Sequence, residues 1–249
     1  MKRPYKITFI LLGAIALLVL VVVANVSRSR ALVRGVEVHI RYGKTPVLVQ
    51  EQTVKDSIFA AMPALLQQQV RSVDRSQVVE AAGRVPWLSE INASVSVSGK
   101  VVVRACQRRP IARLYYGDNE WYFDSEGVMM PAACDGNCNV LVAGGDFVEP
   151  LRTDSLNAQV LALVQLATFL DRESKYGDMI DQIFIERDGD IILVPKLGNH
   201  VVELGTLDDL NEKFAHLLAF YRKGMPRAGW DTYSRVSLKF KNQVVCTKR

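Results

Sequence analysis

The chain has 249 residues, of which 49% are hydrophobic, and its 31 lysines and arginines exceed its 26 acidic residues to give a net charge of +5. This modest charge is scattered rather than gathered into a basic run, which argues against a nucleic-acid-binding protein. The length is sufficient for a membrane segment and one or two small domains.

The first feature along the chain is an uncharged apolar stretch of 18 residues, Ile7 to Ala24. As a helix it would be about 27 Å long, close to the roughly 30 Å hydrocarbon core of a bilayer. We therefore predict a cytoplasmic tail at 1–6, a transmembrane helix at 7–25 and an exported remainder. A cleaved signal peptide ending near Ala24 is the alternative, although the apolar region of such peptides is usually only about 7–15 residues long.

The next block, 33–107, predicts a small α+β layer. Apolar and polar residues alternate over 36–41 as in a half-buried strand, and Val54, Ile58 and Met62 recur at helical spacing. Asp74, with Gln77 three residues later, predicts the start of a second helix that ends before Pro86. Two alternating strands follow, so the predicted order is strand, helix, helix, strand, strand.

The loop between these last two strands determines which side chains share a face. An odd-numbered loop at Ser98-Gly99-Lys100 pairs Val97 with Val101 and Val95 with Val103, and so unites the apolar positions. We predict this register.

The remaining block, 108–249, is rich in strand patterns, and we predict an antiparallel sheet with flanking helices. Gly117-Asp118-Asn119 and Asp188-Gly189 are the predicted tips of two hairpins. Helices are expected over about 156–173 and 207–221. Two strands, within 234–240 and 243–247, close the chain and are joined near Lys241-Asn242.

The four cysteines are Cys106, Cys134, Cys138 and Cys246. In an oxidising exported compartment, the turn-rich CDGNC at 134–138 is first interpreted as a local Cys134–Cys138 disulfide. Free thiols are the second interpretation. A metal site is the third, because no histidine lies nearby in the sequence to complete a ligand set.

The sequence contains no motif of a known catalytic or nucleotide-binding site, such as G-x-S-x-G, H-E-x-x-H, a P-loop or G-x-G-x-x-G. The histidines His39, His200 and His216 lie in strand or helix patterns that explain them structurally. We predict no catalytic residue, cofactor or metal, and a protein that is not an enzyme. The alternative is an exported thiol or cell-wall enzyme that uses CDGNC or scattered carboxylates.

The final strand suggests a contact site instead. A terminal strand often lies at a sheet edge with one row of backbone groups unpaired, and such an edge accepts a strand from a partner. The alternative is that this strand only closes the sheet beside its neighbour. The candidate partner-binding residues, on this strand and its mate, are Arg235, Lys239, Phe240, Gln243, Val244, Val245 and Thr247.

The order of these features resembles the FtsQ/DivIB family of bacterial cell-division proteins, which have a short tail, one span, a POTRA domain and a β domain. Pro86-Trp87, RRPIAR at 108–113, FDSEG at 123–127 and VVELG at 201–205 are similar to motifs of that family. The chain departs from the family pattern at Gln107, where glutamate is common, and at 237–240, which usually reads Asp-Leu-Arg-Tyr.

The resemblance implies a POTRA domain at 33–107 and a β domain at 108–249. It also implies a non-enzymatic component of the division machinery in the bacterial inner membrane, with its domains in the periplasm at the septum. Its expected partner is the FtsB–FtsL pair, bound in part as a strand added beside Gln243 to Thr247. A POTRA-containing assembly factor of another system is the remaining alternative.

Overall fold

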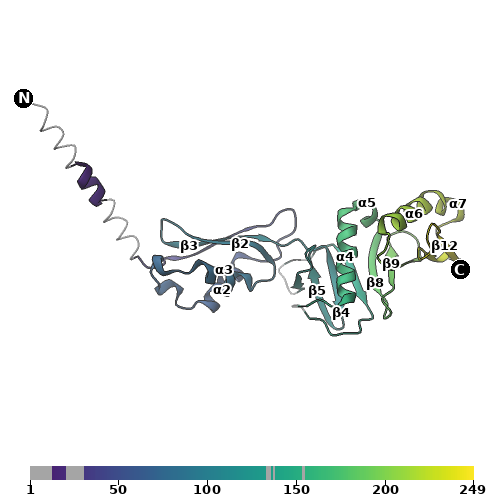
Figure 1. The fold of residues 1–249 in the computed structure, drawn as a ribbon, viewed down its shortest axis with the longest axis horizontal. Helices are drawn as coiled ribbons and strands as arrows, with labels where there is room; N and C mark the ends of the chain where they lie inside the picture. Colours follow the sequence, from purple (N-terminus) through teal and green to yellow (C-terminus); the bar gives the residue numbers. More distant parts are fainter. Residues whose placement is uncertain (1–12, 21–30, 133–135, 137, 153–154) are drawn as a thin grey trace, which may run out of the picture. The chain divides into compact units, whose positions relative to one another are not determined.

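The computed structural model describes residues 13–20, 31–132, 136, 138–152 and 155–249 (Figure 1). The chain divides into two compact units, Met1–Gln107 and Arg108–Arg249. We call them the N-terminal and the C-terminal unit. Each combines a β-sheet with helices, so the architecture is α+β.

The predicted transmembrane helix requires correction. Residues 13–20 are helical. Within the part of the chain that the structure describes, no helix is long and apolar enough to cross a membrane. The tail at 1–6 and residues 7–12 and 21–25 of the predicted span lie outside the described residues.

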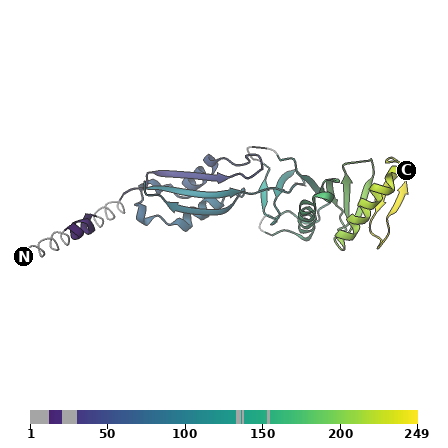
Figure 2. The same cartoon turned by 90° about the horizontal axis from the view of Figure 1, so that it is seen from above.

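The N-terminal unit contains a three-stranded sheet with the order β1-β3-β2, in which β1 runs parallel to β3 and β2 runs antiparallel to it. The helices α2 and α3 lie on one side of this sheet (Figures 1 and 2). In chain order the elements are β1 (Gly35–Arg41), α2 (Glu51–Ala61), the 3-10 turns η1 (Leu65–Gln67) and η2 (Val70–Ser72), α3 (Arg75–Gly83), β2 (Leu88–Val95) and β3 (Lys100–Gln107).

Local chemistry sets the ends of the second helix of this unit. The Asp74 side chain accepts a hydrogen bond from Ser76 N at 2.9 Å, which caps α3 where the sequence predicted. Val78, Ala81 and Ala82 are the buried residues of α3. Trp87, which follows α3, is 4% exposed and belongs to the core of this unit.

The hairpin between β2 and β3 has an odd loop, but its register differs from the predicted one. Val95 pairs with Val101 and Ala93 with Val103. Val97 therefore lies in the loop and is 73% exposed. Gly99 explains the shift because it adopts φ +83°, the left-handed conformation that ends a three-residue hairpin loop.

The C-terminal unit contains a nine-stranded sheet with the order β12-β11-β10-β9-β8-β7-β4-β5-β6. Its elements are β4 (Ala112–Tyr116), β5 (Asn119–Phe123), β6 (Met129–Pro131), β7 (Leu141–Gly145), α4 (Ala158–Arg172), α5 (Ser174–Gly177), β8 (Ile180–Ile185), β9 (Ile191–Pro195), β10 (Val201–Gly205), α6 (Leu210–Lys223), α7 (Met225–Ala228), β11 (Tyr233–Ser237) and β12 (Val245–Lys248).

This sheet is mixed, so the prediction of an antiparallel sheet is wrong. The pairs β4–β7, β7–β8 and β10–β11 are parallel. Parallel neighbours need a long crossover. The chain provides one through α4 between β7 and β8, and another through α6 and α7 between β10 and β11.

One face of the sheet carries the core of the C-terminal unit. Val160, Leu163 and Ala167 of α4 and Phe214 and Leu217 of α6 are buried there against inward-facing strand residues. The opposite face is more open, since Phe184 of β8 and Arg235 of β11 are exposed there. Side chains on these strands therefore alternate between core and solvent.

Candidate functional site

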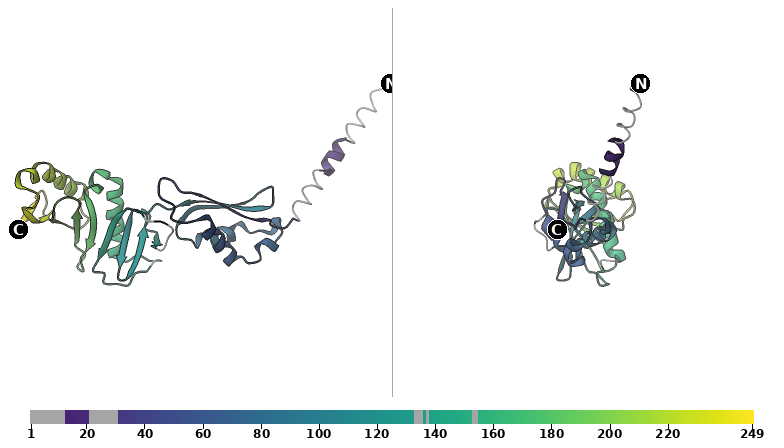
Figure 3. Two further views of the ribbon diagram at one scale, coloured as in Figure 1. Left: turned by 180° about the vertical axis from the view of Figure 1, so that it is seen from behind. Right: turned by 90° about the vertical axis from the view of Figure 1, so that its left-hand side faces the viewer.

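The terminal strand β12 lies at one end of the nine-stranded sheet, next to the C-terminus (Figures 1 and 3). It pairs with β11 in antiparallel orientation. No strand within the described residues pairs with its other side. Such a free edge is a template for strand addition.

One hydrogen bond indicates which neighbouring strand each backbone group of β11 faces. Leu238 N donates to Glu203 O at 2.8 Å, so the backbone of Leu238 is directed toward β10. Successive residues of a strand direct their backbone groups to opposite sides, so Ser237 faces β12. Ser237 is paired there with Val245, and the N–H of Val245 therefore faces inward, toward β11.

A second hydrogen bond supports the same assignment from the other end of β12. Arg249 N donates to Thr232 O at 3.2 Å, so Arg249 also faces inward. By alternation Thr247 faces inward too, while the N–H groups of Cys246 and Lys248 face the free edge. The free edge thus presents these two donors.

Arg235, one of the predicted partner-binding residues, lies on β11, the neighbour of β12 in the sheet. It forms an ion pair with Glu203 on β10, whose side chain is only 16% exposed. Burial pushes the pKa of the Glu203 carboxyl up, but the hydrogen bond and the charge of Arg235 oppose burial, and the pKa is lowered overall. The ion pair therefore holds the Arg235 side chain toward β10, the neighbour of β11 on the side away from the free edge, and the side chain remains 52% exposed.

The turn that joins β11 to β12 carries four further predicted residues, Lys239, Phe240, Gln243 and Val244. Lys239 forms an ion pair with Asp190, and the hydrogen bond with Asp190 raises the pKa of the Lys239 ammonium. Phe240 is 56% exposed. Gln243 N donates to Phe240 O at 3.3 Å, and Asn242 closes the turn at φ +59°.

The predicted residues of β12 itself complete the surface. Val245 is 42% exposed, and Thr247 is exposed as well. Val244, the residue before β12, packs in part against the core. The fold thus brings all seven predicted residues to one edge and the adjoining turn of the C-terminal unit.

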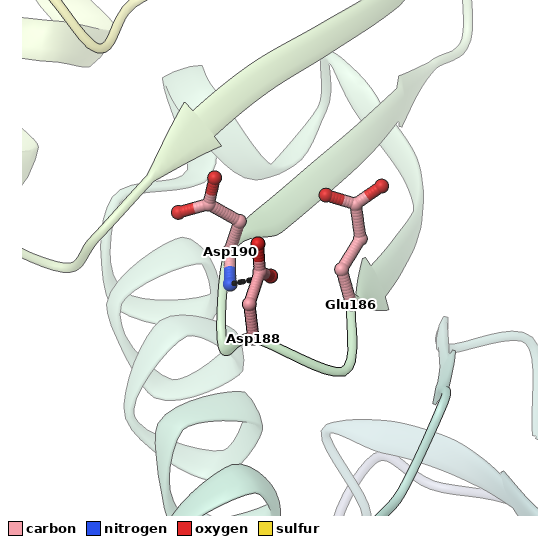
Figure 4. A group of neighbouring side chains, drawn as sticks. All are labelled: Glu186, Asp188 and Asp190. Carbon is pink, nitrogen blue, oxygen red and sulfur yellow. Dashed lines mark hydrogen bonds between the residues drawn. The ribbon is translucent and has the colours of Figure 1, made fainter.

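Three carboxylates meet at the tip of the β8–β9 hairpin, where Glu186, Asp188 and Asp190 lie with their oxygens within 4.8 Å of one another (Figure 4). Asp188 Oδ1 accepts from Asp190 N at 3.1 Å, as is usual in a turn. Asp190 also holds Lys239. Turn formation and ion pairing therefore account for two of the three carboxylates.

Sequence reasoning missed the partners that hold the predicted residues. Glu203 lies in the VVELG motif and Asp190 in a hairpin turn, and neither was predicted to contact the closing strands. The alternation of VVELG does mark Glu203 as an outward polar residue. The ion pairs themselves depend on long-range pairing.

The predicted Cys134–Cys138 disulfide falls partly outside the described residues, because Cys134 is not among them. Cys138 is 8% exposed.

A family model described as FtsQ/DivIB, C-terminal related, matches residues 109–247. The match covers more than half of the chain and nearly all of the C-terminal unit. The chain belongs to this FtsQ/DivIB-related family. The resemblance found in the sequence is therefore confirmed, and family membership indicates a role in cell division, association with the division septum and contacts with other division proteins. No curated protein matches the chain.

Proposed function

We propose that this FtsQ/DivIB-related protein is a non-enzymatic scaffold of the bacterial division machinery that binds a partner by accepting a strand along β12. The expected partner is the FtsB–FtsL pair. Through it the scaffold would link early and late septum-assembly proteins.

The single observation that supports this function best is the pair of outward N–H groups, those of Cys246 and Lys248, at the free edge. A partner strand would accept these donors into a continued ladder, which provides affinity through the main chain. Arg235 and Phe240 lie close by to contact the side chains of the added strand. An arginine and an aromatic residue are the types most often found at the energetic centre of protein interfaces.

The N-terminal unit would serve as a second docking surface. Its element order of strand, helix, helix, strand and strand, with the β1-β3-β2 sheet, supports its assignment as a POTRA domain.

A scaffold role also fits the state of two cysteines. The hydrogen bond to Glu90 and then burial raise the pKa of the Cys106 thiol, and burial raises the pKa of the Cys246 thiol. Raised values keep a thiol protonated, whereas nucleophilic cysteines have lowered values. Cys106 and Cys246 therefore have the character of structural residues.

The experiment is a pull-down of the full chain with the FtsB–FtsL pair. Lys248→Pro removes an outward N–H while leaving the inward groups of Val245 and Thr247 in place, and it should abolish capture. The matched control Lys248→Ala keeps the N–H and should retain capture. Equal capture by both variants would contradict strand addition at β12.

Val245→Pro tests the assignment of direction. Its N–H faces β11, so this change should disturb the β11–β12 pairing itself and lower the thermal stability of the protein. Lys248→Pro should leave the midpoint of thermal unfolding close to that of the parent chain. The opposite ranking of the two midpoints would show that the assigned directions are reversed.

A further inference from the structure

The hairpin end of the N-terminal unit holds a hollow of about 570 Å³. Three arginines line it, Arg34, Arg71 and Arg75, together with Val70 and the loop residue Val97. We call this the hairpin hollow. It is distinct from the β12 edge, which lies in the other unit.

Backbone hydrogen bonds hold together the segments that form the hairpin hollow. Arg34 N donates to Gly99 O at 2.9 Å, and Val70 N donates to Ala31 O at 2.9 Å. An isolated bridge joins Leu32 to Gln69. The segment that carries Leu32 and Arg34 is thus held between the hairpin loop and the segment before η2.

The charges of the hollow are unbalanced. Within the described residues, no carboxylate forms an ion pair with Arg34, Arg71 or Arg75, and no carboxylate lines the hollow. The neighbouring Asp74 is occupied as the cap of α3. The surface therefore suits an anionic partner.

The same surface exposes apolar side chains beside these arginines. Val97 is 73% exposed at the loop tip, and Leu32 is 55% exposed. Large apolar side chains next to unpaired cations are typical of surfaces that lie in the headgroup region of a membrane.

A second observation in this unit points to lipid rather than to a soluble anion. Residues 13–20 are helical and exposed throughout, and the large apolar side chains of Ile15, Leu17, Leu18, Val19 and Leu20 are each more than half exposed. The eleven chain steps from Leu20 to Ala31 limit their separation to at most about 40 Å. An apolar surface of this kind marks a site of contact with an apolar environment.

We propose that the hairpin hollow docks on the surface of a membrane that contains anionic phospholipid, with Arg34, Arg71 and Arg75 on lipid phosphates and Val97 among the headgroups. The contact involves one leaflet surface and orients the N-terminal unit on it.

The test uses the full chain mixed with vesicles of phosphatidylcholine alone or with about a third of phosphatidylglycerol, and measures backbone hydrogen exchange. Within the described residues, the N–H groups of Val97 and Ser98 have no hydrogen-bond acceptor, so they should exchange fast in the free protein. Exchange at these two residues should slow on the anionic vesicles and less on the neutral ones. High salt should reduce the difference.

The decisive variant is Arg34→Gln/Arg71→Gln/Arg75→Gln. Each arginine removed should weaken the preference for anionic vesicles about fivefold. The matched control, Lys44→Gln/Lys55→Gln/Arg104→Gln, removes the same charge from the same unit outside the hollow and should keep the preference. The apolar N-terminal residues are identical in all variants, so they affect every arm equally.

Equal protection on neutral and anionic vesicles would overturn the proposal. So would protection that survives in the hollow variant, or that is lost to the same degree in the control variant. Equal protection by inorganic pyrophosphate without vesicles would identify a site for free anions and would overturn the lipid assignment.

Discussion

Gln107 at the end of β3 is joined to Leu48 by a buried hydrogen bond, in which Leu48 N donates to Gln107 Oε1 at 2.7 Å. The same oxygen accepts from Val49 N at 3.3 Å. On the other side of the amide, Gln107 Nε2 donates to Pro46 O at 2.8 Å and to Thr45 Oγ1 at 2.9 Å. One side chain thus ties the 45–49 segment to the sheet of the N-terminal unit.

This arrangement explains why glutamine suits a position where the family resemblance suggested glutamate. Gln107→Glu would keep the acceptor for Leu48 but place a carboxylate oxygen against Pro46 O, so that this hydrogen bond becomes a contact between two acceptors, while the Thr45 hydroxyl can turn to donate. We expect the free energy of unfolding to fall by about 1–3 kcal/mol. Urea unfolding measures it, with the exposed Gln67→Glu as control, and equal stability of the two variants would contradict this account.

The ion pair between Arg108 and Asp124 leads to a second prediction about the free energy of unfolding. Arg108 Nη1 lies 2.6 Å from Asp124 Oδ2, and the Asp124 side chain is 7% exposed. Asp124 Oδ1 also accepts from Glu126 N and Val128 N, both at 2.9 Å, and so shapes the turn after β5. Asp124→Asn keeps these acceptors but removes one of the two carboxylates that face Arg108, the other being Glu126 at 2.8 Å, and should cost about 1–3 kcal/mol.

The neighbouring pair provides the matched control for Asp124→Asn. Arg109 pairs with Asp171 at 2.5 Å, but the Arg109 side chain is 56% exposed. Asp171→Asn should therefore cost less than about 1 kcal/mol. Losses of the same size at both sites, measured by urea unfolding, would show that burial does not determine the strength of the Arg108–Asp124 pair.

The buried His200 should make the free energy of unfolding depend on pH. It is 2% exposed, and its Nε2 lies 2.7 Å from Tyr221 Oη. Burial, and to a lesser degree the charge of Arg249, lowers the pKa of the His200 imidazole. Below about pH 6.5 the unfolded chain binds a proton that the folded chain resists. The free energy of unfolding should therefore fall as pH decreases, by up to about 1.4 kcal/mol per pH unit.

Urea unfolding at pH 5.5 and 7.5 measures this effect. His200→Gln offers Tyr221 a polar partner that does not titrate, so the variant should lose much of the dependence. His39→Gln, at an exposed position, should retain it. A dependence unchanged in His200→Gln would assign the effect to another group.

Local chemistry made part of the fold predictable. The cap at Asp74 and the hairpins with Gly117 and Gly189 near their tips lie where the sequence placed them, because each depends on residues only a few positions apart. The position of β7 between β4 and β8 was not predicted, since its parallel pairing joins segments that are far apart in the sequence, with β5 and β6 between β4 and β7 and α4 between β7 and β8. The β2–β3 register was missed because the conformation of Gly99 outweighed the apolar pattern.

The candidate site, like the fold, was predictable from local patterns only in part. The alternating pattern of the closing strands suggested a terminal edge and its residues. The directions of the Cys246 and Lys248 N–H groups depend on contacts that β11 and β12 make with Glu203 and Thr232, which no local pattern reveals. The ion pairs of Arg235 and Lys239 are likewise long-range.

The most direct test of strand addition is residue-resolved amide exchange by NMR on the full chain, with and without the FtsB–FtsL pair. We predict that binding slows exchange at Cys246 and Lys248 by at least tenfold, while Val245 and Thr247, already bonded to β11, change much less. Binding that leaves exchange at Cys246 and Lys248 unaltered would contradict the central claim.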